Sequence, residues 1–176
     1  MTYRHIDGVA KALAQFSNDR KFRYRLDIFL PNYSPAHEMA CVVMQNPSYA
    51  CEKIADKSVQ FMEKNIFLRG LPELSGVRRL VVVNQFALIQ TNNFKAKSTE
   101  TDTKNDDAIR RALLESEIVI IAWGKANRFR ERQDFVLGLL QRLKGKKLFQ
   151  TRMHPARGHY KDFIRPVRIE NGSLVS

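Results

Sequence analysis

Apolar and polar residues alternate along this chain with two different periods. Short, nearly continuous apolar runs that stop abruptly at polar or aromatic residues are typical of strands buried on both faces of a sheet. Four such runs span residues 41–44, 80–84, 118–122 and 147–151. Between them, apolar residues at helical spacing predict three helices, over residues 52–64, from a cap at Thr103 or Asn105 to Glu115, and over residues 131–143.

The ends of the chain and one long connection carry weaker patterns. The first 20 residues show a faint helical spacing of apolar side chains, and basic and apolar residues alternate over residues 20–30. This alternation predicts a half-exposed antiparallel strand whose charges protect a sheet edge. Residues 90–104 are polar and predict a surface loop, and the segment after residue 151 is a tail rich in Pro and Arg.

Strands alternating with helices predict an α/β fold with right-handed crossovers. We expect a three-layer α/β/α arrangement with a central four-stranded, mainly parallel sheet and an antiparallel N-terminal edge strand. A chain of 176 residues fits a single domain over residues 1–176. No apolar run approaches the ~20 residues that cross a bilayer, so we expect no membrane partner.

Compartment and cofactor expectations follow from the N-terminus and the cysteines. The N-terminal residues lack the apolar core of a signal peptide. Cys41 and Cys51 are the only cysteines, and Cys41 belongs to a predicted core strand, which argues against a disulfide framework. We therefore expect a cytoplasmic protein. Two cysteines also exclude a four-thiolate iron–sulfur cluster.

The charge of the chain is concentrated near its C-terminal end. The formal net charge is +12, and residues 125–168 hold 13 Lys and Arg residues against three acids, a net of +10. A solvated basic face would explain this as an ordinary surface. Because the charge flanks the ends of the third and fourth predicted strands, we favour a nucleic-acid partner.

Four side chains follow the predicted strands directly: Asn46, Asn84, Trp123 and His154. Ligands of open parallel sheets bind at the carboxyl ends of the strands, so we expect these residues around one crevice. Each also has an ordinary structural interpretation. The two asparagines suit turns or caps, and Trp123 is either a core residue or an aromatic platform for a ligand. His154 is the least expected on structural grounds, and it is suited to stabilise a leaving group.

Familiar catalytic motifs are missing from the sequence. It contains no Walker phosphate loop, no G-x-G-x-x-G, no G-x-S-x-G and no H-E-x-x-H. His154 and His159 lack neighbouring cysteines or carboxylates, so we predict no metal site and no cofactor. Asp102, Asp106 and Asp107 are interpreted as residues at a helix start rather than as a general acid–base pair.

Several short motifs in a fixed order carry a resemblance. They are Gln45-Asn46-Pro47-Ser48, Val81-Val82-Val83-Asn84 with Phe86-Ala87, Asn105-Asp106, Ala122-Trp123-Gly124 and His154-Pro155. In order and spacing, over residues 41–163, the set resembles the uracil-DNA glycosylase superfamily. It resembles more closely an uncharacterised bacterial and phage family, a domain of unknown function.

The resemblance implies a role for each site residue. Asn46 positions the attacking water, Asn84 binds the polar edge of a flipped base, and His154 stabilises the departing base anion. Tyr49 or Phe86 stacks on the base. The reaction implied is base extrusion followed by cleavage of the N-glycosidic bond. From the residues themselves, the predicted contacts with the nucleic-acid backbone are Ser48, Lys125, Arg128, Arg152, Arg157 and Lys161.

Two departures from the superfamily pattern change the expected substrate. Met44 replaces the glycine that opens the first motif, and the last motif runs His154-Pro155-Ala156-Arg157 without a following Ser-Pro. These differences argue against uracil itself and leave three hypotheses open. The first is a DNA glycosylase-like enzyme acting on an unusual or modified base. The second is a non-catalytic nucleic-acid binding module, and the third is an enzyme for free nucleotides or nucleosides.

Overall fold

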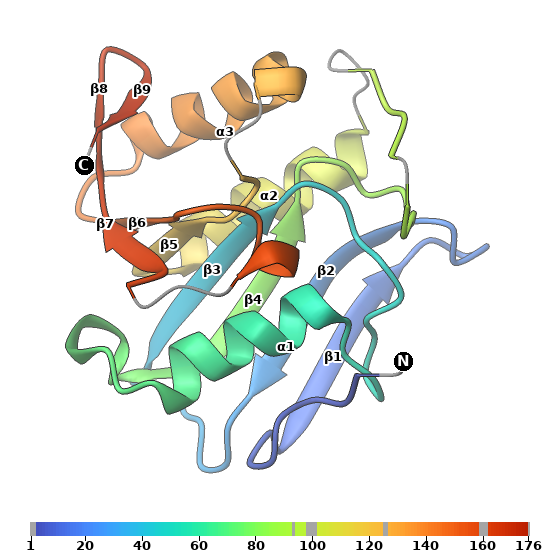
Figure 1. The fold of residues 1–176 in the computed structure, drawn as a ribbon, viewed down its shortest axis with the longest axis vertical. Coiled ribbons are helices and arrows are strands. Elements are labelled where there is room, and N and C mark those ends of the chain that lie inside the picture. The colour runs from blue at the N-terminus through green and yellow to red at the C-terminus, as the bar shows by residue number, and fades with distance from the viewer. Residues whose placement is uncertain (1–2, 93, 98–101, 125–126, 159–161, 176) are drawn as a thin grey trace.

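A mixed sheet of seven strands organises the part of the chain that the structure describes (Figure 1). The computed structural model describes residues 3–92, 94–97, 102–124, 127–158 and 162–175. The strand order is β1-β2-β4-β3-β5-β6-β7. The strands are β1 (Lys11–Phe16), β2 (Arg23–Phe29), β3 (Glu38–Met44), β4 (Val77–Asn84), β5 (Ile118–Ile121), β6 (Lys147–Thr151) and β7 (Ile164–Pro166).

The four strands predicted from apolar runs form the parallel centre of this sheet. They are β4, β3, β5 and β6, and each runs parallel to its neighbours within this group. At the middle of the group, Val42 of β3 pairs with Val82 of β4 and with Ile120 of β5. The chain places β4 on one side of β3 and β5 on the other, so the strand order changes direction at β3.

The sheet is wider than the four strands expected, because antiparallel strands extend both edges. β2 pairs with β4, β1 pairs with β2, and β7 pairs with β6. The helical expectation for the first 20 residues is wrong, since residues 11–16 form β1. Only Ala12 of this edge strand is buried, and the apolar run of β1 is only three residues long, residues 12–14. The strand expected over residues 20–30 exists as β2. It is the second strand of the sheet and not the edge strand expected, because β1 pairs with its outer side.

The C-terminal tail adds β7 and a hairpin, β8 (Arg168–Glu170) and β9 (Ser173–Val175).

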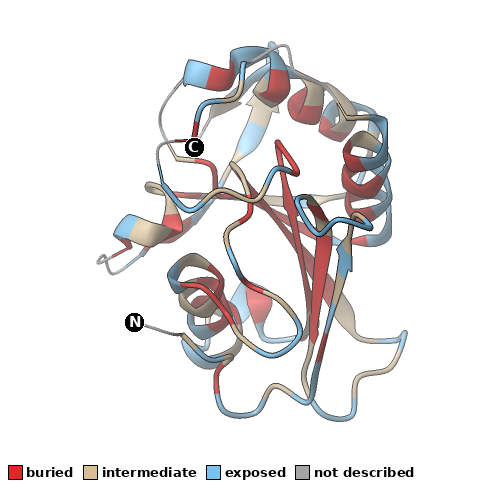
Figure 2. Cartoon of the chain, turned by 90° about the vertical axis from the view of Figure 1, so that its right-hand side faces the viewer, coloured by how far each residue is buried: buried red, intermediate tan, exposed pale blue. Residues whose placement is uncertain are grey.

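Helices cover both faces of the sheet and give the three layers expected. α1 (Lys57–Glu63) and the π-helical turn that continues it (Lys64–Leu68) pack on one face. α2 (Thr103–Glu115) and α3 (Arg130–Arg142) pack on the other. Figure 2 shows the buried strands between helices on the two sides. None of the described helices is long and apolar enough to cross a membrane.

Side chains of β3 alternate between these two layers. Val42 and Met44 belong to the core on the α1 face, and Cys41 and Val43 belong to the core under α2 and α3. Full burial of an aliphatic side chain of this size contributes roughly 1.5–3 kcal/mol. Because both faces are covered, β3 has no polar face, and this explains its continuous apolar sequence.

Aspartate caps fix where two of the helices begin. Asp56 accepts a hydrogen bond from the Val59 backbone N–H at 2.9 Å, so α1 starts at Lys57 and not at residue 52. Asp102 accepts from the backbone N–H groups of Lys104 and Asn105 at 2.9 and 3.3 Å. The cap of α2 is therefore Asp102, and neither residue proposed from the sequence fills that position.

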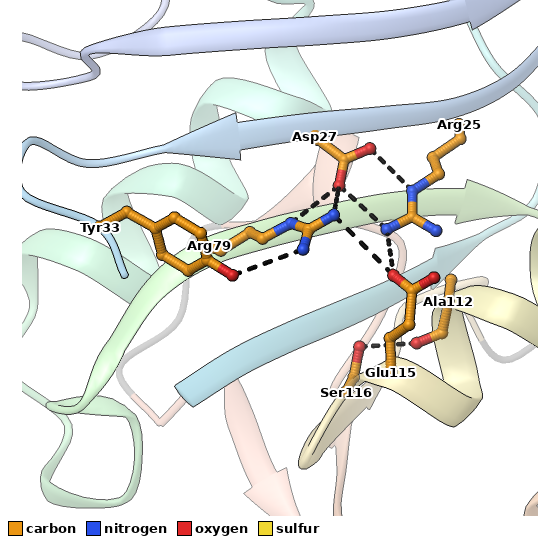
Figure 3. Close-up of polar contacts among 7 residues, drawn as sticks. All are labelled: Arg25, Asp27, Tyr33, Arg79, Ala112, Glu115 and Ser116. Carbon is orange, nitrogen blue, oxygen red and sulfur yellow. Dashed lines mark hydrogen bonds and ion pairs between the residues drawn. The ribbon is translucent and has the colours of Figure 1, made fainter. Parts of the chain in front are cut away.

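A cluster of paired charges lies between β2, β4 and the end of α2 (Figure 3). Asp27 accepts hydrogen bonds from Arg25 Nε at 2.7 Å and from Arg79 Nη2 at 2.7 Å. Glu115 accepts from Arg25 Nη2 at 2.6 Å. The pKa of Arg25 is raised, because its bonds to the two carboxylates outweigh the opposing effect of burial. Two cations and two anions compensate one another, so the cluster ties α2 to the antiparallel side of the sheet.

Candidate active site at the carboxyl ends of the central strands

A pocket of about 650 Å³ opens beside the carboxyl ends of β3, β5 and β6. It lies where the strand order changes direction, the place at which open α/β sheets bind their ligands. Asn46, Trp123, His154 and Arg157 all line it. The structure therefore brings together four of the residues that sequence analysis selected. They come from three different strand ends.

Asn46 follows β3 and closes the loop into which this strand runs. Its Nδ2 donates hydrogen bonds to the carbonyl oxygens of Pro47 at 3.1 Å and of Gln90 at 2.7 Å. Its Oδ1 accepts one from Gln45 Nε2 at 3.2 Å. An amide oxygen accepts two hydrogen bonds, so Oδ1 keeps one acceptor position. The side chain holds the loop in place and retains one group for a ligand or a water molecule.

His154 caps the short helical turn η4 (Pro155–Arg157), and this cap fixes its tautomer. Nδ1 accepts the Ala156 backbone N–H at 3.2 Å. A neutral imidazole that accepts at Nδ1 carries its proton on Nε2. Within the described chain, Nε2 has no hydrogen-bond partner. Burial lowers the pKa of His154, the charge of Arg157 lowers it further, and Asp56 opposes both. At neutral pH, His154 is therefore an uncharged side chain with a free N–H donor.

Gly124 allows the end of β5 to approach the backbone of His154 closely. Its φ of +87° lies in the region that favours glycine. A Cβ at this position would lie 3.3 Å from His154 N and 3.4 Å from His154 Cβ. The glycine of the Ala-Trp-Gly motif thus sets the position of the histidine in the His-Pro motif.

The predicted aromatic residues occupy three different environments. Trp123 packs in the core under α2 and α3 and also forms part of the pocket wall, so its two interpretations hold together. Phe86 is buried against Phe94 and Phe129, with ring centroids 5.1 and 4.9 Å away. Tyr49 is 38% exposed. It lines neither this pocket nor a second, smaller pocket that adjoins it. The structure does not bring Tyr49 or Phe86 to the pocket that holds Asn46 and His154.

Asn84 is buried, lines neither this pocket nor the smaller one, and contacts a residue that was not among the predicted site residues. Its Oδ1 accepts a hydrogen bond from Arg23 Nη2 at 3.2 Å, and Arg23 Nη1 donates to the carbonyl of Ala50 at 2.8 Å. Arg23 is 1% exposed, and burial lowers its pKa to about 10, with Asp56 partly opposing this. In sequence, Arg23 belongs to an ordinary alternating strand, and no local signal distinguishes it.

A smaller pocket of about 100 Å³ adjoins the first one. Phe94 lines both, and it is buried although residues 90–104 were expected to form a surface loop. Two other residues that line it, Gln85 and Asn105, are each 1% exposed. Sequence analysis assigned no role to Gln85, and it noted Asn105 only within a motif and as a helix cap.

The basic residues proposed to contact nucleic acid are only partly arranged around the pocket. Arg157 is exposed and lines it. Arg152 donates through Nε to the carbonyl of Asp162 at 3.0 Å, and Arg128 lies over the ring of Phe129. Ser48 pairs with Thr91 at 3.3 Å. Lys125 and Lys161 lie outside the described residues.

Carboxylates and metal ligands do not gather at the site. No Asp or Glu is among the described residues that line the larger pocket. Nowhere in the described ranges do three or more His, Cys, Asp or Glu residues form a group able to hold a metal ion. The chemistry available here consists of amide groups, a threonine hydroxyl, a neutral imidazole, aromatic surface and one arginine.

One family model, described as "Protein of unknown function (DUF1643)", matches residues 23–160. This chain belongs to that family. The matched region of the DUF1643 chain extends from buried Arg23 past His154, and so it contains every residue that lines the larger pocket and all but Phe22 of those that line the smaller one. No curated protein and no solved structure matches the sequence.

Proposed function

We propose that this DUF1643 protein hydrolyses the N-glycosidic bond of a base extruded from nucleic acid, with DNA as its substrate. One observation carries the proposal: Asn46 and His154, which follow different strands, line the same pocket at the point where the strand order reverses. The order of the motifs, which resembles the uracil-DNA glycosylase superfamily, supports the same chemistry.

His154 has the properties required to stabilise the leaving group. When the bond between C1′ and the base nitrogen breaks, its electron pair moves to the base, and negative charge develops there. A fixed N–H donor stabilises that charge without having to lose a proton. Nε2 of His154 is such a donor, because Nδ1 is held by the Ala156 N–H and the lowered pKa keeps the ring neutral.

Asn46 supplies the other half of the reaction. Its remaining acceptor position orients a water molecule, whose oxygen forms the new bond to C1′ of the sugar. One proton of this water is lost to solvent, and the departing base takes up a proton. The products are a free base and an abasic sugar. Because the loop carbonyls of Pro47 and Gln90 hold the amide, the oxygen keeps a fixed position.

A nucleic-acid partner is supported by charge. The net charge of +12 favours polyanions, and Arg157 adds a cation at the pocket itself. A free nucleoside would gain little from this charge. Extrusion of the base from the duplex would bring it between the aromatic side chains that line the two pockets.

The proposal is tested by release of bases from defined DNA. Oligonucleotides carrying uracil, mismatched, oxidised, alkylated and hypermodified bases are incubated with the protein and then cleaved at abasic sites with alkali. We expect cleavage at one class of base, and a loss of about 10²–10³-fold in rate for His154→Ala with DNA affinity unchanged. Arg142→Ala, which removes a charge from an exposed position of α3, is the matched control. Turnover by His154→Ala at the wild-type rate would contradict the proposed site.

One observation favours a second candidate, a binding module without catalysis. Both hydrogens of the Asn46 amide donate to main-chain carbonyls, which is sufficient reason for an asparagine at this position. In that case no base in the panel is released, yet DNA binds with an affinity that falls steeply with salt. The same assay therefore separates the two candidates.

A further inference from the structure

The smaller pocket holds polar groups that the protein itself leaves without partners. Gln85 has neither a donor for its Oε1 nor an acceptor for its Nε2 in the described structure, and Asn105 Oδ1 also lacks a donor. Both residues are 1% exposed and belong to the lining of the pocket. An unpaired buried amide costs about 1–3 kcal/mol, and a partner that binds in the pocket would remove this cost.

The orientation of the Asn105 amide is fixed by its hydrogen bonds. Nδ2 donates to the carbonyl oxygens of Asn84 at 3.1 Å and of Gln85 at 3.2 Å. Only a nitrogen donates to two carbonyls, so Oδ1 is the atom left without a partner among the described residues. This oxygen accepts hydrogen bonds and donates none. Asp102, whose carboxylate caps α2, adds a further acceptor to the lining.

Two of the three guanidinium nitrogens of Arg132 are paired within the protein. It also lines the pocket, but Nε donates to the Gln85 carbonyl at 2.9 Å and Nη2 pairs with Asp106 at 2.6 Å. Its guanidinium carbon lies 5.8 Å from the centroid of the Phe86 ring. These contacts hold the end of β4 and the aromatic wall in place. The buried groups of the lining that lack a partner within the described chain are therefore Asn105 Oδ1, Gln85 Oε1 and Gln85 Nε2, and they lie beside the carboxylate of Asp102.

We propose that Gln85 and Asn105 bind the edge of a pyrimidine that bears an exocyclic amino group, namely cytosine or a modified cytosine. The amino group offers two donors, one for Asn105 Oδ1 and one for Gln85 Oε1, and the adjacent ring nitrogen accepts from Gln85 Nε2. Uracil and thymine present one donor between two carbonyl oxygens, so one protein acceptor stays unpaired. This identification of the ligand as a base rests on the proposed function.

The size and walls of the pocket agree with a single ring. Its volume is about 100 Å³, which admits the edge of one six-membered ring and leaves the second ring of a purine outside. Phe22, Phe86 and Phe94 supply aromatic surface around it. Because Phe94 lines both pockets, a base held here lies next to the pocket of Asn46 and His154.

The test compares two nucleosides that differ at this edge. Isotope-labelled protein is titrated with deoxycytidine and with deoxyuridine, and the side-chain amide signals of Gln85 are followed by NMR. We expect deoxycytidine to shift these signals and to bind about tenfold more tightly than deoxyuridine. Equal affinities, or binding of neither nucleoside, would overturn the proposal and leave ordered water as the partner of these amides.

Variants of the two pockets separate this proposal from the proposed function. Gln85→Leu should lose the preference for deoxycytidine and raise the melting temperature of the free protein, because it removes an unpaired buried amide. Gln141→Leu, at an exposed position of α3, is the control and should change neither. A preference that survives Gln85→Leu contradicts the subsite. His154→Ala should abolish base release yet keep deoxycytidine binding.

The remaining outcomes are equally distinct. Deoxycytidine binding that depends on Gln85, without release of any base, means that the glycosylase proposal fails and the subsite stands. Release of uracil from DNA without any effect of Gln85→Leu means that the glycosylase proposal stands and the subsite fails. If Gln85→Leu does not fold, the two nucleosides compared on the wild-type protein still decide.

Discussion

Two polar clusters each include a residue of α2 and differ in how their groups are paired. In the cluster of Figure 3, Arg25, Asp27, Arg79 and Glu115 satisfy one another through short charge-assisted hydrogen bonds. In the smaller pocket, the amide of Gln85 and the oxygen of Asn105 have no partner in the described chain. One cluster is complete by itself, and the other is complete only with a ligand.

The difference separates polar groups that support the fold from those that serve a function. A buried ion pair contributes little net stability, but removing one member leaves the other charged and buried. An unpaired buried amide lowers stability whether or not its neighbours change. Mutation should therefore damage folding at the paired cluster and binding at the unpaired one. Four predictions are ordered from the largest effect to the smallest: the first removes a member of the paired cluster, and the others compare positions of the larger pocket with positions outside it.

Asp27→Ala should give the largest loss of stability. Asp27 is 5% exposed and accepts hydrogen bonds from two arginines, so its removal leaves both cations without their shared carboxylate. We expect the free energy of unfolding to fall by about 3–5 kcal/mol, as measured by urea denaturation. Asp107→Ala, which breaks an exposed pair with Arg110, is the matched control and should cost less than about 1 kcal/mol. Similar losses in both variants would show that the cluster is not a structural unit.

Gly124→Ala should damage the pocket more than the fold. A positive φ costs a non-glycine residue about 1–2 kcal/mol, and the new Cβ would press on the backbone of His154. Base release should therefore fall at least tenfold, while the protein still folds. Gly145→Ala shares the positive φ, of +79°, but its Cβ meets no atom within 4 Å. That control should lose similar stability and no activity. Equal activity of the two variants would mean that Gly124 does not position His154.

The comparison also explains which parts of the molecule the sequence predicts. The central strands are buried on both faces, and their continuous apolar runs identify them. β1 and β7 are edge strands with few buried side chains, and their sequences carry no comparable signal. Asn46 and His154 were found because each directly follows a strand. Gln85 and Arg23 were missed, because an unpaired or buried polar side chain is visible only once its neighbours are known.

Two histidines should give pH dependence of opposite sign. Burial alone would lower the pKa of His5, but hydrogen bonds to Glu63 and to the Cys51 carbonyl raise it above 6.5. Stability from His5 is complete below pH 6.5 and is lost as the pH rises through the raised pKa. The pKa of His154 is lowered, so its stability is complete above pH 6.5 and is lost as the pH falls below this value.

Urea denaturation between pH 5 and pH 9 checks both signs. The slope from one group is at most about 1.4 kcal/mol per pH unit. His5→Gln should flatten the alkaline side of the stability profile, and His154→Gln should flatten the acid side. With these outcomes, His5, which is hydrogen-bonded at both ring nitrogens, stabilises the fold at low pH. His154, which is bonded only at Nδ1 within the described residues, stabilises it at high pH. A slope that persists in the corresponding variant would assign the titration to another group.

The smallest effect is expected at Arg157, which is exposed but lines the larger pocket. If it contacts a phosphate, Arg157→Ala should weaken DNA binding roughly two- to fivefold and reduce the slope of log affinity against log salt by about one. Arg142→Ala removes the same charge from the last turn of α3, away from either pocket. If both variants lower the slope equally, the net charge of +12 attracts DNA without a specific contact at Arg157. A loss confined to Arg157 would place the DNA backbone at the mouth of the pocket, beside the free N–H of His154.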